Sequence, residues 1–146
     1  MAATKKFIVT ATISKKILYV DDDLDDCVFL TESFASTGEK ANLICASDGE
    51  EAIKYLNANN KESLPSLIIL DLNMPKWDGK QTLSYIKSNP VYASIPVVIL
   101  STSENKQDKE VCAQLGAVSY IQKPFHFDGY KDIVKTCLPL MMSTSE

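Results

Sequence analysis

Five short apolar runs recur along the chain, and longer stretches with a helical spacing of apolar residues separate them. The runs are rich in Val, Ile and Leu and occupy residues 17–20, 43–46, 67–70, 97–100 and 118–121. Runs that are apolar on both faces are typical of strands in a parallel sheet that helices cover on both sides. The hydrophobic pattern therefore predicts five buried strands.

The stretches between the runs predict amphipathic helices. The first helix has one face made of Leu24, Cys27, Val28, Thr31 and Phe34. Gly38 follows it as a stop signal. A second helix opens at 48–51 and turns three apolar residues inward, which are Ala52, Ile53 and Leu56.

Three further helices follow. One is expected at about 79–88, before the break at 89–90, and another at about 105–115, ending at Gly116. The last has the clearest amphipathic spacing, with apolar residues at Phe127, Tyr130, Ile133, Val134, Cys137 and Leu138.

Strands and helices thus alternate as five βα units, which predicts a doubly wound α/β domain with a five-stranded parallel sheet. Crossovers of this length return each strand parallel to the one before it, with a right-handed turn. We expect one domain at 15–138, an N-terminal extension at 1–14 and a C-terminal tail at 139–146. Residues 7–13 alternate apolar residues with Thr, so they would either add an edge strand or lie outside the fold.

Composition narrows the classes of function. The chain has 146 residues and a net charge of −4, and all 15 of its basic residues are Lys. Without Arg or a basic run, direct binding to nucleic acid is not expected. No apolar run approaches the ~20 residues that a membrane span needs, and the Thr-interrupted start is not a signal peptide. We therefore expect a cytoplasmic protein.

The four cysteines lie far apart, at Cys27, Cys45, Cys112 and Cys137. Scattered cysteines without CxxC spacing argue against a zinc site and against a small disulfide scaffold. In a cytoplasmic protein we expect them to be reduced and mostly buried.

Polar residues capable of chemistry follow four of the five predicted strands. They are Asp21, Asp22 and Asp23 after the first, Asp71 after the third, Ser101 and Thr102 after the fourth, and Lys123 with Pro124 after the fifth. Ligands of open α/β sheets bind at the carboxyl ends of the strands. Asp23 alone is explained as a helix N-cap, but caps need no lysine or hydroxyl opposite them. Crowded carboxylates repel one another unless a cation joins them, and Mg²⁺ prefers oxygen ligands.

These residues lie in segments that resemble the receiver domain of bacterial response regulators. The matching segments are Ile17–Asp22, Leu70–Pro75 with Asp78–Gly79, Pro96–Thr102 and Gly116–Phe125. The resemblance implies a flavodoxin-like strand order, 2-1-3-4-5. It also implies a protein that signals by changing shape after accepting a phosphoryl group.

The resemblance assigns a role to each residue of the site. Asp71 would be the phosphoacceptor. Mg²⁺ would be held by Asp22, Asp71 and the backbone carbonyl of Asn73. Asp21 would assist through a water, or by contacting the direct ligands without binding the ion. Lys123 would offset charge on the transferred group, while the Ser101 hydroxyl and the Thr102 N–H donate to it. Ser101 and Tyr120 would form the switch, although Tyr120 also suits an ordinary strand position. The Lys123–Pro124 bond would be cis.

The expected function is that of a single-domain response regulator. Its partners would be a histidine kinase or histidine phosphotransfer protein and an unknown downstream protein, and a homodimer is compatible with the sequence. Residues 92–96 and 101–103 are similar to regulators that serve phytochrome-type and hybrid histidine kinases. The chain would catalyse its own phosphorylation and dephosphorylation without being a conventional enzyme.

Two other classes compete with this one. An unphosphorylated interaction module of the same fold usually lacks the acceptor, an acidic partner or the lysine, and all three are present here. A haloacid-dehalogenase-type phosphatase needs an acid two residues after its nucleophile, where this chain has Asn73.

Overall fold

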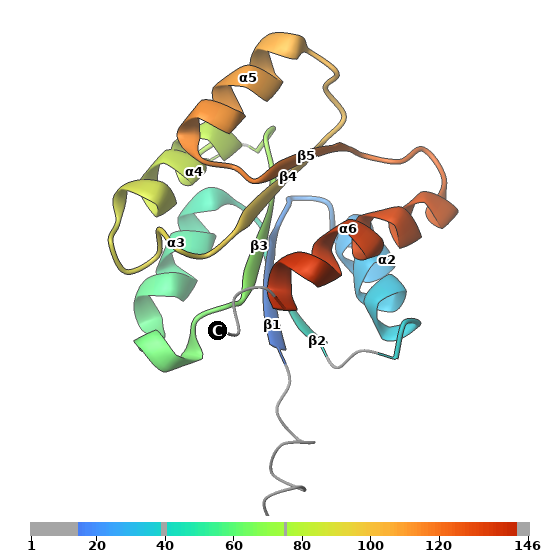
Figure 1. The fold of residues 1–146 in the computed structure, drawn as a ribbon, viewed down its shortest axis with the longest axis horizontal. Coiled ribbons are helices and arrows are strands. Elements are labelled where there is room, and N and C mark those ends of the chain that lie inside the picture. The colour runs from blue at the N-terminus through green and yellow to red at the C-terminus, as the bar shows by residue number, and fades with distance from the viewer. Residues whose placement is uncertain (1–14, 39–40, 75, 143–146) are drawn as a thin grey trace, which may run out of the picture.

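A parallel sheet forms the centre of the computed structural model, which describes residues 15–38, 41–74 and 76–142. Its strands are β1 (Lys15–Val20), β2 (Ala41–Ala46), β3 (Leu67–Asp71), β4 (Val97–Ser101) and β5 (Ser119–Gln122). They pair in the order β2-β1-β3-β4-β5 (Figure 1). The predicted fold class and strand order are confirmed. The question of an edge strand at 7–13 lies outside the described residues.

Helices cover both faces of this sheet. They are α2 (Leu24–Ala35), α3 (Gly49–Ala58), α4 (Gly79–Ser88), α5 (Lys106–Leu115) and α6 (Tyr130–Met142), with short 3₁₀ turns η1 (Lys61–Ser63) and η2 (Phe127–Gly129). In Figure 1, α3, α4 and α5 lie on one side of the sheet, and α2 and α6 lie on the other. Among the described residues, none of the helices is both long and apolar enough to span a bilayer.

The sheet separates two hydrophobic clusters because successive side chains of a strand point to opposite faces. One cluster, beneath α3, α4 and α5, includes Leu18, Val20, Ile68, Leu70 and Ile99. The other, beneath α2 and α6, includes Ile17, Tyr19, Leu67, Ile69 and Leu100. Strands β3 and β4 are therefore buried on both faces, which explains their continuous apolar sequences.

The inward face of α2 differs from the predicted one. The helix buries Cys27, Leu30 and Phe34, whereas Leu24 and Val28 are 72% and 52% exposed. Apolar residues occur on more than one side of this helix, so their spacing did not fix which side faces the sheet. Asp23 caps the helix, as predicted, by accepting a hydrogen bond from the N–H of Asp25.

The last helix is longer than predicted. It begins at Tyr130, leaving Phe127 half-exposed in η2, and continues through Pro139 to Met142. The side chain of Met141 is only 2% exposed and joins the cluster beneath α2 and α6. The burial of Met141 favours a continuous helix even though Pro139 lacks a backbone N–H. The predicted end of the domain at Leu138 therefore falls inside this helix.

The expectation of four reduced cysteines is wrong for two of them. Cys27 of α2 and Cys45 of β2 form a disulfide, with Cα atoms 6.5 Å apart, and Cys45 is exposed. Their separation of 18 residues carries no disulfide signal, because the two meet only when α2 folds across β2. Cys112 and Cys137 are free and buried, as predicted.

The buried end of α6 leads to a stability prediction. Met141→Ala should lower the free energy of unfolding by about 2–4 kcal/mol, because it leaves a cavity in the core. Lys135→Ala, at an exposed position of the same helix, should change it by less than about 0.5 kcal/mol. Urea unfolding of both variants measures the difference. Equal, small effects would contradict a structural role for the helix beyond Pro139.

Candidate functional site

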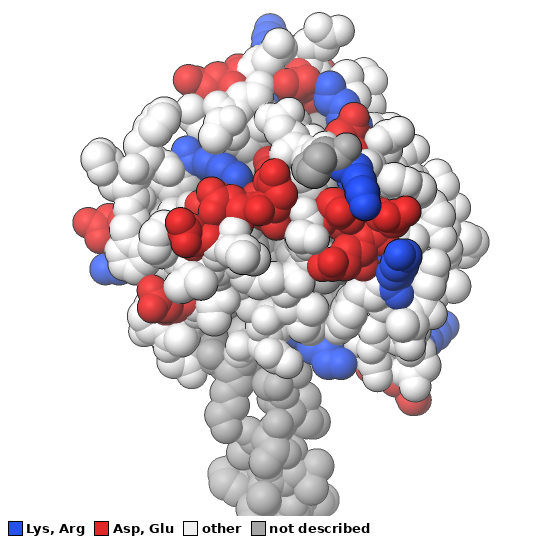
Figure 2. All heavy atoms as spheres, turned by 180° about the vertical axis from the view of Figure 1, so that it is seen from behind, with Lys and Arg blue, Asp and Glu red and all other residues white. Residues whose placement is uncertain are grey.

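Two neighbouring strands bring three carboxylates together at one edge of the sheet. Asp21 and Asp22 follow β1, and Asp71 is the last residue of β3, which pairs with β1 up to Val20 and Leu70. One oxygen from each acid lies within 4.8 Å of the others. Asp21 and Asp71 are buried, whereas Asp22 is exposed. Figure 2 shows acidic side chains gathered into two patches near the middle of the face in view.

Asp71 has a strongly perturbed titration. Burial, followed by repulsion from Asp21 and Asp22, raises its pKa to about 7 against the attraction of Lys123. The N–H of Asn73 also favours the charged form, by donating to Asp71 Oδ1 at 3.4 Å. Crowded oxygen donors with too little neighbouring positive charge are the surroundings that suit a hard divalent cation. The acidic group can therefore hold such an ion.

Lys123 reaches this group from the end of β5. Its Nζ lies 2.8 Å from Asp21, 2.9 Å from Asp26 and 3.8 Å from Asp71. Burial lowers the pKa of Lys123, but its hydrogen bonds to Asp21 and Asp26 outweigh burial and leave the pKa above its ordinary value. The ammonium group is therefore charged and shared among the acids.

The Lys123–Pro124 bond is trans, since the described residues contain no cis peptide bond. The predicted cis bond is therefore wrong. Bonds before proline favour the trans form by only about 0.5–1 kcal/mol, so the sequence alone does not determine the isomer. The strand itself positions the lysine, because the Lys123 N–H donates to the Ser101 carbonyl at 2.7 Å.

Three supporting residues did not emerge from the sequence. Asp26, in the first turn of α2, accepts hydrogen bonds from Lys123 and, at 2.7 Å, from the Tyr130 hydroxyl. The Tyr19 hydroxyl donates to Asp21. Asp26 lies in the first turn of the helix that directly follows the acidic run, which could have indicated that it lies near the same edge. Tyr19 and Tyr130 occupied apolar positions, which concealed their polar role.

Ser101 and Tyr120 meet at a common loop. Ser101 is fully buried, and its Oγ accepts the N–H of Ser103 at 3.1 Å. Tyr120 is half-buried, and its hydroxyl donates to the carbonyl of Ser103 at 3.0 Å. Thr102, which lies between Ser101 and Ser103 in the sequence, is exposed.

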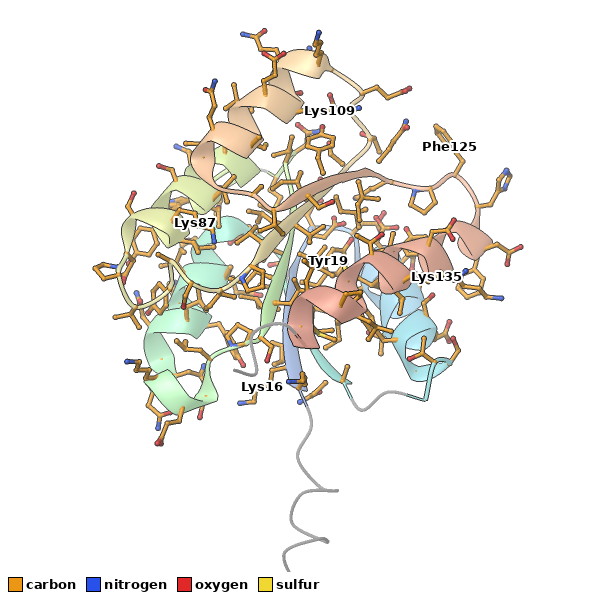
Figure 3. All side chains as sticks on the ribbon, viewed as in Figure 1. Lys16, Tyr19, Lys87, Lys109, Phe125 and Lys135 are labelled. Atoms are coloured by element: carbon orange, nitrogen blue, oxygen red, sulfur yellow. A yellow bond between two sulfur atoms is a disulfide. The ribbon has the colours of Figure 1, made fainter. Side chains whose placement is uncertain are left out.

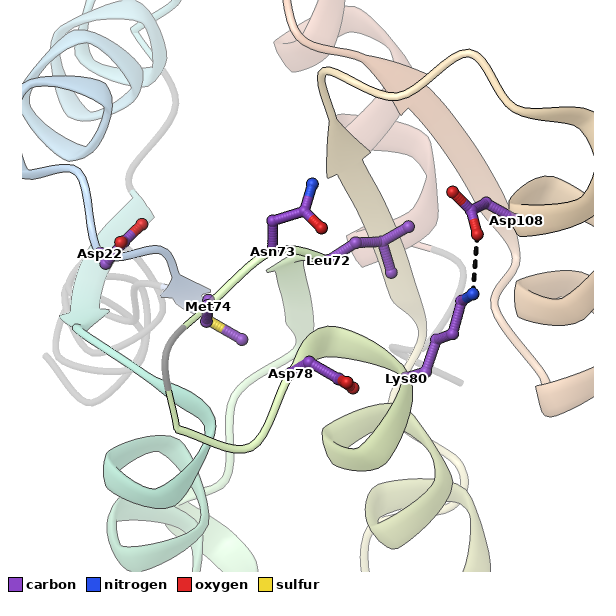
Figure 4. A pocket seen from close by; sticks show the side chains of 7 residues that line it. All are labelled: Asp22, Leu72, Asn73, Met74, Asp78, Lys80 and Asp108. Carbon is purple, nitrogen blue, oxygen red and sulfur yellow. Dashed lines mark hydrogen bonds and ion pairs between the residues drawn. The ribbon is translucent and has the colours of Figure 1, made fainter.

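A pocket of about 360 Å³ adjoins the acidic group. The residues that line it are Asp22, Leu72, Asn73, Met74, Asp78, Lys80 and Asp108 (Figure 4). Lys80 and Asp108 form an ion pair of 2.7 Å at one side, and Asp22 lies opposite. The pocket is polar and open, and three of its lining residues are acidic, so it can admit a cation with its waters.

A family model for the response regulator receiver domain matches residues 17–135. The chain therefore belongs to the response regulator receiver family of two-component signalling proteins. Response regulator Rcp1 of Synechocystis is 37% identical over 112 residues, which cover 75% of this chain and 76% of that protein. The probable chemotaxis protein CheY of Rhizobium etli is 31% identical over 120 residues, which cover 82% and 89%.

Solved structures agree with this assignment. The phosphorylated cyanobacterial phytochrome response regulator RcpA matches with a TM-score of 0.81 and 36% identity over 92% of this chain and 98% of that one. The Mn²⁺-bound form of response regulator Rcp1 matches with a TM-score of 0.78 and 32% identity over 90% and 97%. The fold, the acidic group and the family thus agree.

The crowding of carboxylates predicts an unusual effect on stability. In metal-free buffer, Asp71→Asn should raise the free energy of unfolding by on the order of 1–2 kcal/mol, because one repelling charge is lost. Mg²⁺ should stabilise the wild type and have a smaller effect on the variant, which lacks a ligand. Urea unfolding with chelator or with Mg²⁺ measures both effects, and Asp132→Asn, exposed on α6, is the control. A less stable Asp71→Asn protein in metal-free buffer would show that repulsion does not dominate.

Proposed function

We propose that this chain is a single-domain response regulator that accepts a phosphoryl group on Asp71 from a histidine kinase or a histidine phosphotransfer protein. The observation that carries the proposal is the buried carboxylate of Asp71, with Asp21 and Asp22 within 4.8 Å and Lys123 at 3.8 Å. A cytoplasmic location, where such donors act, belongs to the same proposal. The acceptor, both acidic partners and the lysine are all in place, which disfavours a module that is never phosphorylated.

Asp22, Asp71 and the backbone carbonyl of Asn73 would hold Mg²⁺, with Asp21 assisting through a water. When bound, the ion supplies positive charge beside the transferred group. A carboxylate oxygen of Asp71 attacks phosphorus as the phosphorus–nitrogen bond of the donor histidine breaks. Lys123 offsets charge on the phosphoryl oxygens, and the Ser101 hydroxyl and Thr102 N–H donate to them. Water later attacks the same phosphorus, the phosphorus–oxygen bond to Asp71 breaks, and inorganic phosphate leaves, which restores the carboxylate.

The switch follows from the position of Ser101. Ser101, which carries this hydroxyl, is the last residue of β4, and its neighbour Leu100 pairs with Asp71. When this hydroxyl turns to the phosphoryl group, the loop that also holds Tyr120 must adjust, and the ring can change its packing. We propose that the altered surface binds a downstream protein or a second copy of the chain.

Exposed apolar side chains around the site suit a protein donor. Leu24 and Phe125 are 72% and 86% exposed, and Val28 and Phe127 are also exposed. Phe125 points away from the body of the protein in the loop after Lys123 (Figure 3). Exposed apolar groups gathered near a reactive site mark a docking surface. The similarity to regulators named for phytochrome makes a phytochrome-type kinase our first candidate partner.

Acetyl phosphate tests the acceptor directly. With Mg²⁺, wild type should gain one phosphoryl group, seen as an increase in intact mass, whereas Asp71→Asn should gain none because the nucleophile is lost. Asp128→Asn, at an exposed position of η2, should be labelled like wild type. Labelling that persists in Asp71→Asn would rule out Asp71 as the acceptor.

The docking surface predicts a difference between donors. Phe125→Ser should slow transfer from a phosphorylated histidine kinase or phosphotransfer protein by about tenfold, because it removes an apolar anchor. Transfer from acetyl phosphate should stay unchanged. Val118→Ser is the control, because Val118 is also exposed but lies before β5, at the opposite end of that strand from Phe125. Equal slowing with both donors would place Phe125 in the chemistry, and no slowing would move the docking surface elsewhere.

A further inference from the structure

Each polar group of Ser103, in the loop between β4 and α5, takes part in a hydrogen bond. Its N–H donates to Ser101 Oγ at 3.1 Å, and its carbonyl accepts from the Tyr120 hydroxyl at 3.0 Å. Its own hydroxyl donates to Asp108 Oδ2 at 2.9 Å and accepts from the Asn105 N–H at 3.1 Å. One residue thus connects the buried hydroxyl of β4, the aromatic ring of β5 and the first turn of α5.

These contacts continue across the pocket to α4. Lys80 Nζ donates to the second oxygen of Asp108, at 2.7 Å (Figure 4). That hydrogen bond raises the pKa of Lys80 and lowers the pKa of Asp108, so both groups are charged near neutral pH. A surface ion pair adds little to global stability. It can still shift a balance between two arrangements of one loop.

The two helices that the pair joins are anchored unequally. Gly79, beside Lys80, donates its N–H to the Leu72 carbonyl at 2.9 Å, and a Cβ on Gly79 would lie 2.5 Å from the carbonyl oxygen of Asp71. The start of α4 is therefore pressed against the end of β3. In contrast, α5 fully buries only Cys112. Lys80 thus lies on a firmly packed helix, α4, whereas Asp108 lies on α5, which can move more easily.

We propose that Lys80, Asp108 and Ser103 form a latch that holds the β4–α5 loop in its unphosphorylated arrangement, and that phosphorylation of Asp71 releases it. The inference rests on the proposed function and adds positioning residues to it. A phosphoryl group would bring negative charge beside the pocket that Lys80 and Asp108 line, attracting the first and repelling the second. Ser103 is then free to follow Ser101, because its N–H stays with the Oγ that turns toward the phosphoryl oxygens.

Hydrogen exchange of the unphosphorylated protein tests the latch alone. Lys80→Met and Asp108→Asn should each speed amide exchange in residues 102–108 by about two- to fivefold, as expected for an exposed pair. The double variant should exchange no faster than either single variant, because all three lack the same ion pair. Lys106→Met, exposed in the first turn of α5, should leave exchange unchanged. Unchanged exchange in both single variants, or additive effects in the double variant, would overturn the latch.

Beryllofluoride, which mimics a phosphoryl group on a carboxylate, gives a second readout in the presence of Mg²⁺. Asp108→Asn should bind it about two- to fivefold more tightly than wild type, since less binding energy opens the loop. Lys80→Met should gain less, because it also loses the attraction between Lys80 and the anionic mimic. Asp108→Glu, which keeps the charge, should restore wild-type binding, and high salt should shift wild type toward the variants. Equal affinities would overturn the latch, whereas wild type that binds no mimic would overturn the proposed function and leave the exchange result to decide the latch.

Discussion

Lys123 lies between the carboxylates of Asp21, Asp26 and Asp71, at 2.8, 2.9 and 3.8 Å, and the chemistry of the site depends on this uneven distribution of charge. The ammonium group is held by Asp21 and Asp26 and lies furthest from Asp71, the proposed phosphoacceptor. Asp71 therefore remains buried and poorly compensated, with its pKa raised to about 7. A cation bound among the carboxylates would relieve the repulsion on Asp71. A phosphoryl group on Asp71 would compete with Asp21 and Asp26 for Lys123.

The surrounding fold keeps these charges from separating. Strands β3 and β4 are buried along their whole length, so the sheet cannot relax to let Asp71 move into solvent. Asp78 closes a capping box with Gln81 at the start of α4, which fixes the turn that follows Asp71. Gly49 allows a close approach on the same side, because a Cβ there would lie 2.5 Å from the Trp77 carbonyl. Tight packing around the loop thus maintains an electrostatic arrangement that repulsion alone would disperse.

The sequence predicted features that depend on local pattern and missed those that depend on tertiary packing. Strand positions followed from buried runs, and the acids, hydroxyl and lysine followed from where those strands end. The inward face of α2 was wrong because Leu30 is buried by its contact with the sheet while Leu24 is not. The site roles of Asp26, Tyr130 and Ser103 arise from contacts between elements far apart in the chain. The spacing of residues along the sequence does not reveal such contacts, and it does not reveal the pairing of Cys27 with Cys45.

That disulfide ties α2 to β2 across a segment of the chain that includes the loop between them. A bridge that closes a loop of this size stabilises the folded state by roughly 3 kcal/mol, because it lowers the conformational entropy of the unfolded chain. Oxidised and reduced preparations of the same sequence therefore differ in their free energy of unfolding. Added thiol would lower the melting temperature of this protein with no change in its sequence. A single melting curve therefore describes the protein only when its redox history is known.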